Sequence, residues 1–122
     1  MAYFTSSERR NYFAVFSTGR PLVLLHGITN SGCAWGAQLG PFVAAGYQVI
    51  VPDHAGHGAS GPLQAPVSVA DLADDVRTLL DELAIGSADV VGLSLGGLEG
   101  VMNFAADKAR CRDENPQALS ER

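Results

Sequence analysis

The chain has 122 residues, of which 47% are hydrophobic, a composition typical of a globular domain rather than of a disordered segment. Thirteen acidic and eight basic residues give a formal charge of −5, and the basic residues form no cluster. We therefore do not expect the protein to bind nucleic acid. No stretch approaches the roughly 20 apolar residues of a membrane helix, and the N-terminus lacks a signal-peptide pattern. With only two cysteines in the chain, we expect a soluble cytoplasmic protein.

The first half of the chain predicts strands that alternate with a helix. The expected elements are strands over residues 11–16, 22–25 and 47–51, a helix over 34–45, and a loop over 53–66. A polar turn over 6–10 precedes the first strand. The run 22–25 is continuously apolar, as in a strand covered on both faces of a parallel sheet.

The second half predicts one well-marked helix and one strand. Ser68 and Asp71 form a capping box, and apolar residues follow at helical spacing as far as residue 83. We expect the acidic residues of this helix to face solvent; they are Asp71, Asp74, Asp75, Asp81 and Glu82. A strand over 88–93 follows, and a second helix is expected over 98–106. Strands and helices in this order predict an α/β fold with a mostly parallel sheet and helices on both faces.

The composition changes after residue 106. Eight of the last sixteen residues are charged, and the pattern predicts no further strand there. We therefore expect one domain over residues 1–106 and a poorly ordered polar tail over 107–122.

The sequence Gly92-Leu93-Ser94-Leu95-Gly96-Gly97 has the G-x-S-x-G pattern of a nucleophile elbow. In such an elbow a serine sits on a tight turn between a strand and a helix. Gly92 and Gly96 allow the strand and the helix to approach without a Cβ clash. The pattern predicts that Ser94 is a nucleophile for acyl transfer.

An acyl-transfer enzyme also needs two N–H groups directed at the developing oxyanion. One such donor belongs to the residue after the nucleophile, here Leu95. The segment His26-Gly27-Ile28 follows the strand over 22–25, at the end of the strand where open α/β sheets bind ligands. The backbone N–H of Ile28 is the expected second donor, and His26 and Gly27 form its supporting turn.

Taken together, these motifs resemble the N-terminal half of an α/β-hydrolase. The resemblance covers residues 12–104 and includes the His26-Gly27 turn, Trp35, the loop 53–60, the capped helix and the elbow. It implies a truncated α/β-hydrolase sheet and a serine hydrolase of the esterase, lactonase or cofactor-free haloperoxidase type. Such an enzyme acts on small carboxylic esters or lactones through an acyl-enzyme and uses no cofactor. The resemblance also implies a structural, hydrogen-bonded role for His26.

The chain departs from this family pattern after Ser94. The family's catalytic order is Ser, then Asp or Glu, then His, but no histidine follows His57 in this sequence. A second hypothesis is therefore a truncated or frameshifted hydrolase fragment without independent activity, which could self-associate through an exposed strand 88–93. A metal site at Asp53, His54 and His57 is not expected, because their spacing matches no zinc pattern.

Overall fold

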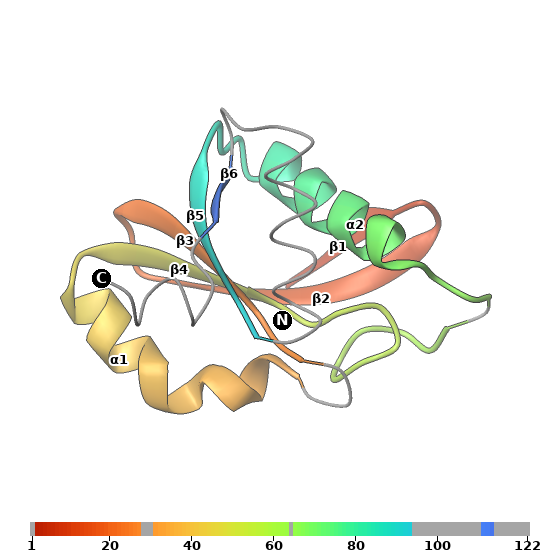
Figure 1. The fold of residues 1–122 in the computed structure, drawn as a ribbon, viewed down its shortest axis with the longest axis horizontal. Helices are drawn as coiled ribbons and strands as arrows, with labels where there is room; N and C mark the ends of the chain where they lie inside the picture. The colour runs from red at the N-terminus through yellow and green to blue at the C-terminus, as the bar shows by residue number, and fades with distance from the viewer. Residues whose placement is uncertain (1, 28–30, 64, 94–110, 114–122) are drawn as a thin grey trace.

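The computed structural model describes residues 2–27, 31–63, 65–93 and 111–113. Its centre is a six-stranded sheet in the order β1-β2-β4-β3-β5-β6 (Figure 1). The strands are β1 (Ala2–Ser6), β2 (Arg9–Phe16), β3 (Arg20–Leu25), β4 (Tyr47–Pro52), β5 (Ala88–Gly92) and β6 (Cys111–Asp113). The pairings β4–β3, β3–β5 and β5–β6 are parallel, whereas β1–β2 and β2–β4 are antiparallel. The predicted mostly parallel sheet is confirmed.

Helices cover both faces of this sheet, as predicted. A 3₁₀ turn, η1 (Gly32–Trp35), leads into α1 (Gly36–Ala44) on one face, and α2 (Val69–Glu82) lies on the other (Figure 1). The capping box at the start of α2 is present: Ser68 Oγ accepts the Asp71 N–H, and Asp71 Oδ2 accepts the Ser68 N–H. These backbone and side-chain bonds from Ser68 hold the pKa of the Asp71 carboxyl below its usual range.

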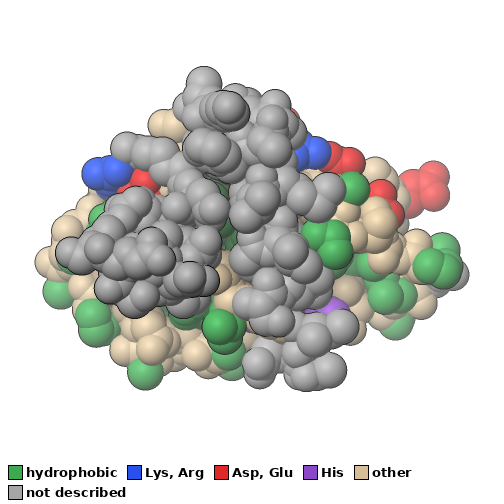
Figure 2. Space-filling model, viewed as in Figure 1, with side chains coloured by type: hydrophobic (Ala, Val, Ile, Leu, Met, Phe, Trp, Pro, Cys, Tyr) green, Lys and Arg blue, Asp and Glu red, His purple; other side chains and the backbone are tan. Residues whose placement is uncertain are grey.

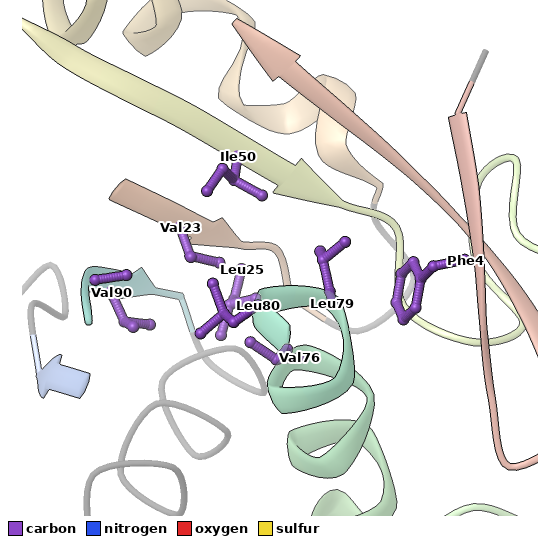
Figure 3. Close-up of a cluster of buried hydrophobic side chains, with 9 residues drawn as sticks. Phe4, Val23, Leu25, Ile50, Val76, Leu79, Leu80 and Val90 are labelled. Atoms are coloured by element: carbon purple, nitrogen blue, oxygen red, sulfur yellow. The ribbon is translucent and has the colours of Figure 1, made fainter. Parts of the chain in front are cut away.

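Two hydrophobic clusters hold the layers together. Between α2 and the sheet, Val76, Leu79 and Leu80 face the strand residues (Figure 3). The strands contribute Phe4, Val23, Leu25, Ile50, Ala88 and Val90 to this cluster. On the opposite face, Trp35 packs with Leu22, Leu24, Val49, Val51 and Val91. The middle strands are therefore covered on both faces, which explains their continuous apolar sequences.

The N-terminal hairpin differs from the sequence prediction. The expected polar turn over 6–10 is only the pair Ser7 and Glu8, which have φ angles of 47° and 67°, and β1 precedes it. Two successive positive φ angles match the right-handed twist of hairpin strands. The hairpin adds two antiparallel strands to one side of the sheet, and β1 brings Phe4 into the α2 cluster.

One acidic residue of α2 is buried, contrary to the expected solvent-facing position. Asp75 is 5% exposed and pairs with Arg9 at 2.6 Å, while Asn11 Nδ2 donates to Asp75 Oδ2 at 3.2 Å. The hydrogen bond that the Arg9 guanidinium donates to Asp75 raises the pKa of Arg9. The prediction was wrong at this position because the hairpin, which lies far away in the sequence, covers that side of α2.

The prediction that no strand follows residue 107 was also wrong. Strand β6 pairs in parallel with β5, with Ala88, Asp89 and Val90 opposite residues 111–113. Strand β5 consequently has neighbours on both sides at Asp89 and Val90, and at these positions it is not the exposed edge that the self-association hypothesis assumed. The remainder of the tail, 107–110 and 114–122, lies outside the described residues, and the proposed domain division stays a prediction.

Candidate active site

The candidate site lies where β3, β4 and β5 end. In the parallel register of β3 and β5, Leu25 lies opposite Gly92, and the Leu93 N–H donates to the Leu25 carbonyl at 3.1 Å. Gly27 and Ser94 each come two positions after this register pair in the sequence. The sheet therefore brings the His26-Gly27 turn and the strand that leads into the elbow to one edge, the ligand-binding edge of open α/β sheets.

The structure describes only part of the predicted constellation. His26, Gly27 and Gly92 lie within the described residues and converge at this edge. The predicted nucleophile and the rest of its surroundings lie outside the described residues; these are Ser94, Leu95, Gly96 and Ile28. The predicted helix over 98–106 also lies outside them.

The three histidines of the sequence form one cluster beside this edge. The His26 and His54 rings are 4.0 Å apart between centroids, and the His57 ring lies 5.3 Å from that of His26. His26 and His54 are buried and His57 is half-buried, and histidine atoms reach the molecular surface in Figure 2. The expected loop over 53–66 thus forms part of the candidate site.

The hydrogen bonds of His26 determine its protonation. Its Nε2 accepts the backbone N–H of His54 at 3.0 Å, and its Nδ1 lies 2.7 Å from the Gly27 carbonyl oxygen. A backbone N–H can only donate and a carbonyl can only accept, so Nε2 is unprotonated and Nδ1 carries the proton. Burial, with the nearby His54 and His57, lowers the pKa of His26 from 6.5 to about 4. The ring is therefore neutral at physiological pH.

Asp53 joins the two loops that flank this edge. Its Oδ1 accepts the Gly32 N–H at 2.6 Å, and its Oδ2 accepts the Ala59 N–H at 2.8 Å. The carboxylate is 6% exposed and enclosed by Gly32 and Gly58; a Cβ on Gly58, whose φ is +51°, would clash with Oδ2. These two hydrogen bonds of Asp53 fix the start of η1 to the loop after β4.

Ser60 anchors the same loop to the sheet. Its hydroxyl donates to the Asp53 carbonyl at 2.8 Å and accepts the Tyr12 N–H of β2 at 2.9 Å. Sequence reasoning assigned no part in the site to Asp53 or Ser60. Their main partners are backbone N–H and carbonyl groups, which leave no mark in a residue pattern, and the one available signal is an aspartate directly after a buried strand.

The described residues can position a backbone turn, but His26 is not available as a base for proton transfer. Both nitrogens of His26 are engaged with backbone groups, and no group of three potential metal ligands occurs among the described residues. A pocket of about 470 Å³ lies elsewhere, between the β1–β2 turn and residues 61–67, with Arg9, Arg10 and Leu63 in its lining. It does not include the His26-Gly27 turn.

The fold defines an open α/β protein with its candidate site at the ends of parallel strands. A model of the α/β-hydrolase fold matches residues 20–112, and the chain belongs to this family. It is 32% identical to the Putative carbamate hydrolase RutD of Azorhizobium caulinodans over 112 residues, or 92% of this chain and 42% of that protein. It is also 38% identical to the non-heme chloroperoxidase CPO-A1 of Kitasatospora aureofaciens, covering 72% of this chain and 32% of that protein.

Solved structures give the same result. Est816, described as an N-acyl homoserine lactone degrading enzyme, superposes with a TM-score of 0.83 at 33% identity, covering 90% of this chain and 42% of Est816. The chain therefore spans less than half the length of these relatives. Within the described part of the chain, no helix is long and apolar enough to cross a membrane.

Proposed function

We propose that the protein is a serine hydrolase that acts on carboxylic esters or lactones, with Ser94 as the nucleophile. The observation that carries this proposal is the register of β3 and β5, in which Leu25 lies opposite Gly92. This register brings the His26-Gly27 turn and the end of β5 to the same edge of the sheet, and in the sequence Ile28 directly follows the first and Ser94 comes two positions after the end of the second. A hydroxyl nucleophile and an oxyanion turn have to meet in this way for acyl transfer.

In the proposed reaction, Ser94 Oγ attacks the substrate carbonyl and the N–H groups of Leu95 and Ile28 stabilise the oxyanion. Expulsion of the alcohol from an ester, or ring opening of a lactone with the hydroxyl kept on the acyl group, leaves an acyl-enzyme, which water then hydrolyses to the acid. The lactone class is supported by the similarity to Est816, whose description names a lactone substrate. Collapse of the oxyanion needs no cofactor, and the alcohol takes up the proton that Ser94 loses.

The proposal is tested by treating the full chain with a fluorophosphonate probe and mapping the label by peptide mass spectrometry. We expect stoichiometric label on Ser94 and none in Ser94→Ala. Ser87→Ala is the matched control, because Ser87 is an exposed serine just before β5 and its loss leaves the labelling unchanged. A folded wild-type chain without label on Ser94 would contradict the proposal.

Turnover separates an enzyme from an inactive fragment. We expect a burst of p-nitrophenol from p-nitrophenyl acetate, equal to the concentration of active chains, followed by slower steady hydrolysis. A burst without later turnover would show that this chain acylates but does not deacylate. That result supports the fragment hypothesis, since removal of triad members leaves only the rate enhancement of the oxyanion hole and binding.

A further inference from the structure

The cavity beside the β1–β2 turn is large enough for a small molecule. Its volume of about 470 Å³ lies within the range of roughly 300–1,000 Å³ that is typical of small-molecule sites. One wall is formed by residues 7–11 of the hairpin, and the other by the loop between β4 and α2, which is drawn yellow-green in Figure 1. The cavity does not include the His26-Gly27 turn, so its chemistry is independent of the candidate active site.

Arg9 brings a hydrogen-bond donor to this cavity that the described residues leave unbonded. A guanidinium has five N–H groups. Nε and Nη2 of Arg9 donate to the Asp75 carboxylate at 3.3 and 2.6 Å, and Nη2 also donates to the Asp71 carbonyl at 3.5 Å. Within the described part of the chain, neither N–H group of Nη1 has an acceptor. Since Arg9 lines the cavity and its side chain is 22% exposed, Nη1 can bind a ligand there.

Asp75 fixes the orientation of this donor. It binds the edge of the guanidinium that Nε and Nη2 form, and because the group is planar, Nη1 lies on the side away from that edge. Asp75 is 5% exposed, and its Oδ2 also accepts a hydrogen bond from Asn11 Nδ2 at 3.2 Å. The donor is therefore preorganised, and a ligand does not have to order a free arginine side chain.

The loop contributes an apolar wall. Its apolar lining residues are Ala55, Pro62, Leu63, Ala65, Pro66 and Val67. Leu63 is 46% exposed and packs against Gly56, where the φ angle is +78° and an added Cβ would lie 2.7 Å from the Leu63 side chain. Leu63 is thus held in place by the loop, and a ligand that covers it removes apolar surface from water.

The charges around the cavity favour an uncharged ligand. Asp75 neutralises Arg9, and Glu8 adds a negative charge to the lining. Arg10 also lines the cavity, but its guanidinium lies over the Tyr3 ring, 4.0 Å from the ring centroid. These opposite charges cancel, so a carboxylate would lose its hydration without a net attraction. A carbonyl oxygen can accept from Nη1 at a much lower cost of desolvation.

We propose that this cavity binds an uncharged small molecule in which a carbonyl group is joined to an apolar body, as in an amide or an ester. The carbonyl oxygen accepts from Arg9 Nη1, and the apolar body covers Leu63. This site is separate from the proposed active site, and its ligand binds whether or not Ser94 is a nucleophile.

The experiment titrates the full chain with ε-caprolactam, an uncharged cyclic amide, and follows the backbone amides by NMR. We expect a Kd on the order of 1 mM, as for other ligands of this small size. The amide signals of Asn11 and Leu63 should shift, whereas those of β5 should not. Hexanoate has the same number of carbon atoms and a negative charge, and it should bind at least about ten-fold more weakly because its carboxylate must be desolvated.

Three variants test the assigned residues, each measured as a chain that circular dichroism shows to be folded. Arg9→Lys keeps a cation for Asp75 but loses the second edge of the guanidinium, and it should raise the Kd about ten-fold. Arg10→Lys is the matched control: the same change at the residue over Tyr3 should leave the Kd unchanged. Leu63→Ala alters an exposed loop side chain and should raise the Kd roughly three- to ten-fold.

The results that would overturn the proposal are distinct. A spectrum that does not shift at about ten times the expected Kd would show that the cavity is not a site for this class of ligand. Hexanoate that binds as tightly as ε-caprolactam would contradict the uncharged ligand. Wild-type affinity in both Arg9→Lys and Leu63→Ala would refute the assigned contacts. A chain that binds ε-caprolactam but does not label at Ser94 would contradict the proposed function and support this site.

Discussion

Replacing Asp53 by Asn tests whether the carboxylate holds the two loops of the candidate site together. Each carboxylate oxygen accepts one backbone N–H, from Gly32 at 2.6 Å and from Ala59 at 2.8 Å. Asparagine has nearly the same shape, but its amide nitrogen cannot accept, so one of these two part-buried N–H groups is left facing another donor.

The cost of Asp53→Asn follows from these two bonds. A buried donor without an acceptor costs about 1–3 kcal/mol, and the remaining bond loses its charged acceptor. We therefore expect the free energy of unfolding to fall by about 2–3 kcal/mol, which for a domain of this size lowers the Tm by roughly 6–12 °C. Urea unfolding followed by the fluorescence of the single tryptophan measures the change.

Amide hydrogen exchange locates the effect. In Asp53→Asn we expect faster exchange at Gly32 or Ala59, with the amides of α2 affected only through the global loss of stability. Glu82→Gln makes the same chemical change on the exposed end of α2 and should stay within about 0.5 kcal/mol of the wild type. If Asp53→Asn and Glu82→Gln unfold at the same urea concentration with unchanged exchange at both loop amides, the reasoning is refuted.

Three further predictions concern the same fold. Asp75→Ala leaves Asn11 and Arg9 without their carboxylate acceptor, and we expect the free energy of unfolding in urea to fall by about 2–4 kcal/mol. A double-mutant cycle with Arg9→Ala that gives no coupling energy would contradict an interaction between Arg9 and Asp75. Because the pKa of His26 is about 4 when folded and 6.5 when unfolded, falling pH protonates the unfolded chain first. Stability should therefore be full above pH 6.5 and fall by up to about 3 kcal/mol toward pH 4, a loss that His26→Asn lacks in the same urea titration. Ser68→Ala removes the cap of α2 and should cost about 1 kcal/mol in urea unfolding, and an unchanged midpoint relative to Ser87→Ala would count against it.

The sequence correctly predicted those elements whose type is set by a pattern of nearby residues. The α2 helix has a capping box at Ser68 and Asp71 and a regular apolar face, and both its start and its type were correctly predicted. The run 22–25 is apolar throughout because β3 is covered on both faces, and it correctly predicted a strand of a parallel sheet. These features depend on neighbours within a few residues, which a pattern records.

Features that depend on distant neighbours were not predictable. The burial of Asp75 depends on Arg9 and Asn11, which belong to another element. Strand β1 escaped notice because its residues alternate in burial over only five positions, and the two-residue turn after it contains no glycine. The bonds of Asp53 end on backbone groups, so its role became apparent only when the loops were placed side by side.

The pairing of β3 with β5 also has a consequence for how the protein acquires its shape. It joins position 22 to position 89, whereas the hairpin joins residues of the first sixteen positions. Local contacts of the hairpin kind form within about 1–10 μs, but distant parallel pairing must first close a long loop and is slow. The β3–β5 edge, where the candidate site lies, should therefore be completed late in folding. A probe that reacts with Ser94 would then report the formation of the native state.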